Sequence, residues 1–247
     1  MNERQKDILK ILGHGELVTV NQLTEKLGVS SVTIRQDLNI LESEGLLKRV
    51  HGGAQINDSD NIAHRLGVHY EQKLRIARKA LEFIREGDTI LIESGSLNAI
   101  LARELSAFND LTVITTNLFI ARQMQKFTQI KVIVPGGIYQ HESESMVGQL
   151  AKLGIDQVNF AKAFIGVDGF THETGFTSRD MLRADISSFI VQKCRLTFVL
   201  TDSSKFGHVE LTKICDASAI QYVITDKAIG ADYEEYFSSI PAQLITV

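Results

Sequence analysis

The sequence predicts an α/β protein in two parts: a small helical domain with a β-hairpin, then a larger domain built on a mostly parallel sheet. Two observations support this. Helical apolar spacing recurs three times before residue 54, followed by a short β-type run and two glycines. After residue 69, β-type runs alternate with helical patterns, as in parallel strands joined by helices. We therefore divide the chain into residues 1–54, a linker at 55–68, and residues 69–247.

Composition limits the class of protein. Of 247 residues, 44% are hydrophobic and 23% are charged, as in soluble globular proteins. No apolar run reaches the length of about 18 residues that a transmembrane helix needs, and the start of the chain has no apolar signal core. Two cysteines without metal-ligand spacing predict buried thiols, no metal site and a cytoplasmic location. No cofactor is expected.

The N-terminal domain opens with two predicted helices. The first covers residues 3–13, with Asn2 as its N-cap. A short extended piece at residues 17–20 follows. Thr19 is the natural N-cap of the second helix, and Gly28 ends it with a tight turn that allows the next helix to cross steeply.

A third helix is expected from residue 30 or 31 to about residue 44. At about 100° per residue, Ile34, Leu38 and Leu41 fall on one side of this helix. The opposite side has side chains that can read base edges in a major groove: a guanidinium, two amides and a small apolar group. These outer residues are Val32, Arg35, Gln36 and Asn39.

Residues 46–50 and the glycines that follow predict a small β-wing, in which Lys48 and Arg49 can touch the DNA backbone. The domain has seven Lys and Arg and seven Asp and Glu, so this prediction depends on geometry and not on net charge. The alternative is a solvated helix face with an ordinary hairpin. Three helices, a turn and a basic wing in this order favour a winged helix-turn-helix that binds double-stranded DNA. The expected DNA-contacting residues are Ser30, Ser31, Val32, Thr33, Arg35, Gln36, Asn39, Lys48, Arg49 and His51.

The larger domain is predicted as alternating helices and strands. Strands are expected at residues 89–93, 112–115, 131–134, 163–167, 196–201 and 222–225, and near residue 244. Helices are expected at residues 69–85, 98–105, 118–126, 150–157 and 181–193. The polar stretch at residues 140–148 is interpreted as a cap for the helix that follows it, or as part of the cleft lining.

Polar or glycine-rich residues follow five of these strands, where open α/β sheets bind ligands. Hydroxyls, glycine and helix N–H groups suit a phosphate, Lys205 can add a point charge, and Asp168 can accept sugar hydroxyls. Each of these five loops alone would be an ordinary turn, but together they predict a binding site for a small anionic ligand. The candidate ligand residues are Ser94, Gly95, Ser96, Asn98, Thr116, Asn117, Gly136, Gly137, Asp168, Gly169, Arg179 and Lys205.

The stretch VTVNQLTEKLGVSSVTIRQDLNILESEGLLKRVHGGA closely resembles the N-terminal signature of DeoR-type transcriptional repressors, with Gln36 where a second Arg is common. The larger domain resembles the effector domain of that family through the same strand-end loops. Glu93 replaces a common Asp, Leu97 and Asn98 stand where Thr is frequent, and Ser187 stands where Lys is frequent, with Arg179 and Arg183 nearby. The resemblance implies a fold like ribose-5-phosphate isomerase and CoA-transferase sheets, and a phosphorylated sugar or related metabolite as ligand.

Two functions fit these observations. The first is a regulator, not an enzyme, that works as a dimer or tetramer on operator DNA and responds to a phosphorylated metabolite. The resemblance implies a repressor of carbohydrate metabolism genes, although the same DNA contacts also serve activation. The alternative is a sugar-phosphate isomerase or group-transfer enzyme with an accessory DNA-binding domain, using Glu93, Asp168, Asp185 and Lys205 as acid–base groups. The N-terminal domain favours the regulator.

Overall fold

The computed structural model describes residues 2–12, 17–43, 46–55 and 62–247. The chain divides into two compact units, Met1–Lys73 and Leu74–Val247, and each is described by itself. The predicted linker includes residues 56–61, which lie outside the described residues. Helix α4 (Ile62–Leu66) also lies in this segment, and its Ile62 and Leu66 side chains are buried.

The first unit confirms the predicted order of helices. Thr19 begins α2 with a capping box, in which its hydroxyl accepts from the Gln22 N–H at 3.3 Å and the Gln22 side chain accepts from the Thr19 N–H at 2.8 Å. Gly28 ends α2 in the left-handed conformation, with φ of 66°. The helices are α1 (Glu3–Leu12), α2 (Val20–Leu27) and α3 (Ser31–Ser43). The predicted ends of the first and third helices, residues 13 and 44, lie outside the described residues.

The predicted wing is also present. Strands β1 (Val18–Thr19), β3 (Gly53–Gln55) and β2 (Lys48–Val50) form an antiparallel sheet in that spatial order. A Cβ atom on Gly53 would lie 2.4 Å from the Val18 carbonyl oxygen. Residue 53 therefore has to be glycine for the wing to approach β1 this closely.

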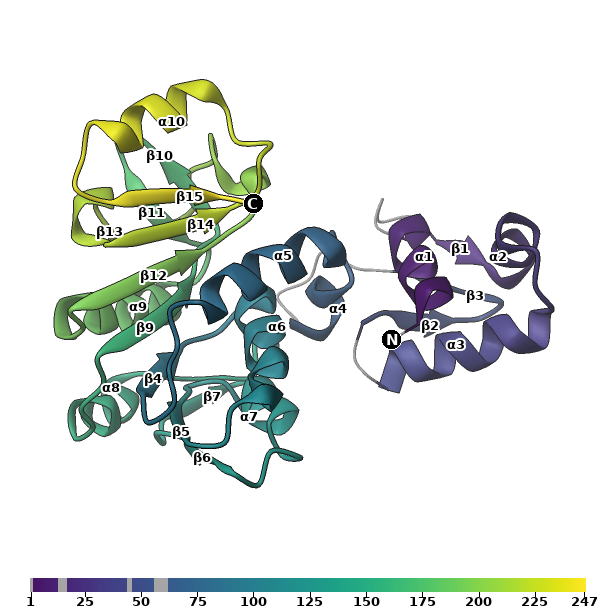
Figure 1. The fold of residues 1–247 in the computed structure, drawn as a ribbon, viewed down its shortest axis with the longest axis horizontal. Coiled ribbons are helices and arrows are strands. Elements are labelled where there is room, and N and C mark those ends of the chain that lie inside the picture. Colours follow the sequence, from purple (N-terminus) through teal and green to yellow (C-terminus); the bar gives the residue numbers. More distant parts are fainter. Residues whose placement is uncertain (1, 13–16, 44–45, 56–61) are drawn as a thin grey trace. The chain divides into compact units, whose positions relative to one another are not determined.

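Residues 74–247, all of which the structure describes, fold around a seven-stranded parallel sheet of order β15-β14-β12-β9-β4-β5-β6 (Figure 1). This confirms the predicted mixed α/β class with a mostly parallel sheet. The strands are β4 (Thr89–Ile92), β5 (Leu111–Ile114), β6 (Ile130–Ile133), β9 (Lys162–Gly166), β12 (Leu196–Leu200), β14 (Tyr222–Thr225) and β15 (Gln243–Thr246).

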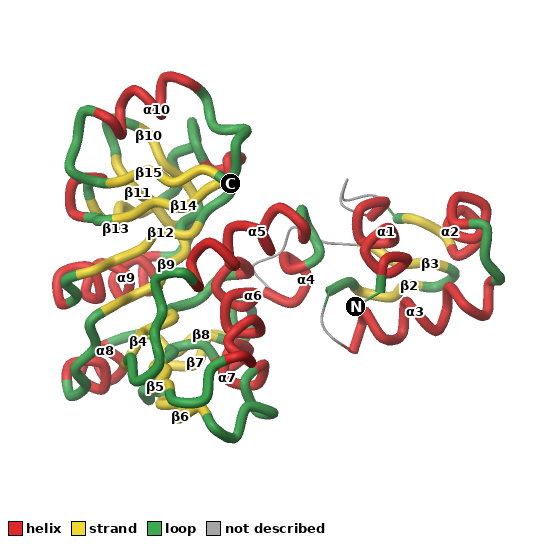
Figure 2. The backbone as a smooth tube through the Cα atoms, viewed as in Figure 1, coloured by secondary structure: helices red, strands yellow, loops and turns green. Residues whose placement is uncertain are grey.

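Helices cover both faces of this sheet (Figure 2). On one face, Leu91 and Ile165 pack with Ile155 of α8 and Ile190 of α9. The other face includes Phe164, whose ring stacks on the Phe198 ring of the next strand at 4.9 Å. Burial on both faces explains why these strands read as nearly continuous apolar runs. The helices are α5 (Tyr70–Leu81), α6 (Ser96–Glu104), α7 (Leu118–Gln123), α8 (Gln149–Asp156), α9 (Met181–Lys193) and α10 (Ala231–Ser238).

Several elements depart from the prediction. The stretch at residues 140–148 belongs to a hairpin of β7 (Ile138–Gln140) and β8 (Ser145–Val147), and no side chain caps α8. Helices α5 and α7 end earlier than predicted. A second antiparallel sheet of β10 (Gly169–Thr171), β11 (Gly175–Ser178) and β13 (Thr212–Cys215) was not predicted, and neither was α10. The unpredicted strands have three or four residues each, too few to establish a period.

Candidate functional site

Helix α3 divides into two faces as predicted. Ile34, Leu38 and Leu41 are fully buried, whereas Val32 is 62% exposed. The other three side chains predicted to read bases are also exposed; they are Arg35, Gln36 and Asn39. The apolar side fixes the helix to its domain, and the outer side presents hydrogen-bonding groups to solvent.

The hydroxyl groups at the start of α3 hold the helix end. Ser30 Oγ accepts from the Thr33 N–H at 3.2 Å and shares a hydrogen bond with Thr33 Oγ1 at 2.9 Å. Arg35 Nη1 donates to Ser31 Oγ at 3.3 Å. These contacts are local and exposed, so DNA phosphates can compete for the same groups.

The wing is hydrogen-bonded to α3. Arg49 donates through Nη1 to Asn39 Oδ1, and the Arg49 N–H donates to Glu42 Oε1 at 2.9 Å. Lys48 and His51 are exposed on the wing. Two of the predicted DNA-contacting residues, Asn39 and Arg49, are thus in contact with each other.

A buried ionic contact that the sequence analysis missed fixes α3 to α1. Asp37 is 3% exposed and accepts from Arg4 Nε at 2.5 Å and from Gln5 Nε2 at 3.1 Å. The hydrogen bond from Arg4 to Asp37 raises the pKa of the Arg4 guanidinium. Asp37 therefore connects α3 to α1.

Replacing Asp37 with alanine is expected to destabilise the first unit by about 1–3 kcal/mol, because the buried Gln5 amide loses its acceptor. Thermal unfolding followed by circular dichroism measures this change. The exposed Asp7→Ala variant is the control. An Asp37→Ala protein that melts at the wild-type temperature would contradict the prediction.

The second unit has a topological switch point between β4 and β9. From β4 the sheet grows through β5 and β6 on one side, and through β9, β12, β14 and β15 on the other. Ligands of open parallel sheets bind outside the carboxyl ends of the strands at such a point. Here those ends lead into Glu93-Ser94-Gly95 and Val167-Asp168. We call this region the strand-end crevice.

Two glycines permit the close approach of these strand ends. A Cβ atom on Gly166 would lie 3.0 Å from the Ser94 carbonyl oxygen, and Gly95 has φ of 105°, which favours glycine. Gly95 also begins α6 without a side-chain cap. The start of α6 therefore presents backbone N–H groups and the positive end of its dipole beside Ser94 and Ser96, a geometry suited to an anion.

Several predicted ligand residues hold the loops together. Asn98 Nδ2 donates to the carbonyl oxygens of Ser94 at 2.8 Å and Phe164 at 3.1 Å. Asn117 Oδ1 accepts from the Ile120 N–H at 3.0 Å, and its Nδ2 donates to the Ser143 carbonyl oxygen at 2.7 Å. These amides join neighbouring segments, so their contacts are structural.

Thr116 and the predicted glycines also have structural contacts. Thr116 Oγ1 donates to the Glu93 carbonyl oxygen at 3.4 Å. A Cβ atom on Gly137 would lie 2.8 Å from the Val147 carbonyl oxygen. A Cβ atom on Gly169 would lie 2.5 Å from the His208 carbonyl oxygen. Gly136 has no such neighbour within 4 Å.

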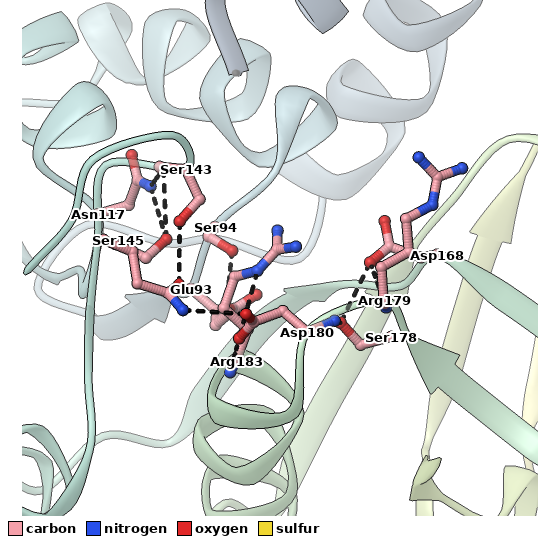
Figure 3. Close-up of polar contacts among 11 residues, drawn as sticks. Glu93, Ser94, Asn117, Ser143, Ser145, Asp168, Ser178, Arg179, Asp180 and Arg183 are labelled. Carbon is pink, nitrogen blue, oxygen red and sulfur yellow. Dashed lines mark hydrogen bonds and ion pairs between the residues drawn. The ribbon is translucent and has the colours of Figure 1, made fainter. Parts of the chain in front are cut away.

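An acidic side chain, Asp168, lies two residues after the end of β9 (Figure 3). Asp168 is 6% exposed and accepts from Ser178 Oγ at 3.1 Å and from the Arg179 N–H at 3.2 Å. The Arg179 guanidinium binds Glu210 at 3.0 Å. Lys205 is half-buried in the short turn after β12. Asp185, an acid–base group in the enzyme alternative, is instead exposed and binds Lys152 of α8 at 2.8 Å.

The structure adds a buried charged cluster that the sequence analysis did not assemble (Figure 3). Glu93 is 3% exposed and accepts from Ser94 Oγ at 2.8 Å. Burial raises its pKa, while the Ser94 hydrogen bond and the charge of Arg183 act in the opposite direction. Asp180, the N-cap of α9, accepts from Gln140 Nε2 at 3.0 Å and so connects the hairpin to α9. Among the charged residues of this cluster, only Asp180 and Arg183 are close in the sequence, at a spacing that is typical of a helix start.

The raised pKa of Glu93 predicts a pH-dependent stability. Folding favours the protonated acid, so its contribution is complete below its usual pKa of 4.5 and is lost as pH rises through the higher pKa of the folded state. The Glu93→Gln variant removes this titration. The wild-type melting temperature should therefore fall relative to the variant between pH 4 and pH 8 in paired scanning calorimetry. A constant difference over this range would contradict the raised pKa.

The remaining sequence predictions concern thiols, metals and membranes. Cys194 is buried as predicted, whereas Cys215 is only partly buried. Burial raises the pKa of the Cys194 thiol, and burial together with the charge of Asp216 raises the pKa of the Cys215 thiol to about 12, so both thiols are poor nucleophiles. The described residues bring no three His, Cys, Asp or Glu side chains together as metal ligands. No helix among them combines the length and apolarity needed to span a membrane.

Comparison with known proteins gives matches over both units. Residues 4–60 match the family described as a DeoR-like helix-turn-helix domain, and residues 68–227 match the DeoR C terminal sensor domain. The HTH-type transcriptional regulator GolR of Listeria innocua is 33% identical, covering 92% of this chain and 91% of the relative. The lactose phosphotransferase system repressor of Lactococcus lactis is 31% identical, covering 96% and 94%. A solved D-ribose-5-phosphate isomerase in complex with phospho-erythronic acid is 18% identical and covers 56% of this chain and 54% of its own, with a TM-score of 0.42.

Proposed function

The chain belongs to the DeoR family of DNA-binding transcriptional regulators, and we propose that it is a repressor whose operator binding responds to a phosphorylated sugar or related metabolite. We assign DNA binding to residues 1–54. Residues 69–247 are assigned to metabolite binding and to assembly as a dimer or tetramer. The name of the Lactococcus lactis relative supports carbohydrate metabolism genes as the targets.

The DNA-binding assignment rests on one observation, the exposed polar face of α3 above its buried apolar side. Arg35 can bind guanine with two hydrogen bonds, and Gln36 and Asn39 can bind adenine. Lys48, Arg49 and His51 lie on the wing, which flanks the recognition helix in this kind of domain. Two copies would read two half-sites related by symmetry.

The metabolite assignment rests on the strand-end crevice. An anion-binding helix start, two hydroxyl side chains and a buried carboxylate converge where open parallel sheets bind ligands. A phosphate would lie at Ser94-Gly95-Ser96, and the sugar hydroxyls would lie toward Asp168. The ligand regulates by binding one arrangement of the DNA-binding domains more tightly than another.

A thermal-shift screen of phosphorylated sugars, with each unphosphorylated sugar beside it, tests this proposal. A true effector at about 100 times its Kd adds about 2.7 kcal/mol of stability. The same compound should change operator affinity in an electrophoretic shift assay. Failure of every phosphorylated sugar both to raise the melting temperature and to change DNA binding would contradict the proposal.

Replacing Lys205 with alanine is expected to weaken binding of the identified sugar phosphate by about 10-fold, with little change in DNA affinity, because Lys205 in the turn after β12 would give the ligand a point charge. Calorimetry on both proteins measures the ligand affinity. The exposed Lys213→Ala variant is the control. Equal ligand affinities of wild type and Lys205→Ala would remove Lys205 from the site.

A further inference from the structure

The strand-end crevice contains a buried cation, Arg183. We propose that Arg183 is the residue that binds the phosphate of the effector, together with the N–H groups of the Ser94-Gly95-Ser96 loop. This inference rests on the proposed function, since it names the charge that recognises the ligand at the same site. Arg183 would then be a specificity-determining residue for phosphorylated over unphosphorylated ligands.

Arg183 lies in the first turn of α9, and its side chain is 9% exposed. Its guanidinium extends toward the end of β4, beside Ser94 (Figure 3). The phosphate-binding loop and this cation therefore meet at one place, although almost ninety residues separate them in the sequence.

Two carboxylates, those of Asp180 and Glu93, lie near the Arg183 guanidinium. Its Nε lies 3.9 Å from Asp180 Oδ1, and Asp180 is itself held by the Gln140 amide. Burial raises the pKa of Glu93 and the charge of Arg183 lowers it, so the two groups interact electrostatically. A buried guanidinium can bind two phosphate oxygens through a planar fork of N–H groups.

Lys205 is the other cation proposed to bind the ligand. Lys205 follows β12, and the strand order β12-β9-β4 places β12 two positions from β4. At about 4.8 Å between strands, the two strand ends lie roughly 10 Å apart. Lys205 is therefore placed for the other end of an extended sugar phosphate, and Arg183 is placed for a group at the loop after β4.

Calorimetric titration of the full chain with inorganic phosphate at constant ionic strength tests the inference. We expect saturable binding by the wild type and an affinity lower by about 10- to 100-fold in Arg183→Ala, as for the loss of hydrogen bonds to a charged group. Arg183→Lys should lie between them, because it keeps the charge and loses the fork. The control is Arg195→Ala, an exposed arginine before β12 at the opposite edge of the sheet.

A second variant separates phosphate binding from a purely structural role. Arg183→Ala leaves Glu93 without its opposing charge, so the protein can lose stability for that reason alone. The double variant Glu93→Gln/Arg183→Ala removes both charges. We expect its melting temperature to recover relative to Arg183→Ala while its phosphate affinity stays low.

Two results would overturn the inference. One is wild-type phosphate affinity in the double variant, which would make Arg183 only a counter-ion of Glu93. The other is the absence of saturable phosphate binding by the wild type. Either result can occur while a sugar phosphate still changes the melting temperature and DNA binding, in which case the proposed function stands and only the role of Arg183 fails.

Discussion

The double variant Arg35→Ala/Gln36→Ala is expected to bind its specific DNA site about 100-fold more weakly than the wild type, because each bidentate contact to a base contributes about 1–3 kcal/mol. Non-specific DNA affinity should change far less, since it depends on phosphate contacts. A site selected from a random DNA pool by the wild-type chain, compared with its scrambled form at fixed salt, measures both quantities.

The control for this experiment is Lys10→Ala, which removes an exposed charge from α1 and leaves α3 unchanged. A double variant that keeps the wild-type preference for the selected site would show that the outer face of α3 does not read bases. Equal losses on the selected and scrambled sites would place these side chains on the phosphate backbone instead.

The second large effect is expected from Gly169→Ala. The new Cβ would lie 2.5 Å from the His208 carbonyl oxygen and 2.8 Å from Thr177 Oγ1, so the backbone has to move. Such overpacking typically costs about 1–3 kcal/mol, which lowers the melting temperature of a domain this size by roughly 2–4 °C per kcal/mol. Because Gly169 follows Asp168, sugar-phosphate binding should weaken as well.

The matched control is Gly136→Ala at another strand end. A Cβ atom there meets nothing within 4 Å, so its melting temperature should stay close to that of the wild type. Scanning calorimetry of the two variants compares the same chemical change in crowded and open surroundings. An unaltered melting temperature for Gly169→Ala would show that the segment around His208 can move away at little cost.

Local chemistry made much of the fold predictable. Thr19 and Gly28 mark the two ends of α2, and both ends are predictable from the sequence. Thr19 begins the helix through short-range hydrogen bonds, and Gly28 ends it because glycine readily adopts the left-handed conformation. Apolar spacing in α3 separated Ile34 and Leu38 from the outer face. The seven parallel strands were found because burial on both faces makes each one a distinct apolar run.

The contacts that were missed join distant segments. Asp37 read as a polar residue of a helix, because its partner Arg4 lies 33 residues earlier. Glu93 and Arg183 meet only through the arrangement of β4 and α9. The hairpin at residues 138–147 has strands of three residues and no glycine turn; Glu144 adopts φ of 53° instead. Such pairings depend on the completed sheet, and apolar periodicity does not indicate them.

The hydrogen bond between Arg49 and Asn39 has a consequence for how this regulator would search DNA. To read an adenine, the Asn39 amide has to exchange its protein partner for a base, and the released guanidinium can then turn to a nearby phosphate. On a mismatched sequence the Asn39 amide gains no hydrogen bond to a base, so the Arg49–Asn39 hydrogen bond would remain and the protein would continue along the DNA. Discrimination at that base pair would thus be shared by two residues ten positions apart, and altering Arg49 would shift base preference as well as overall affinity.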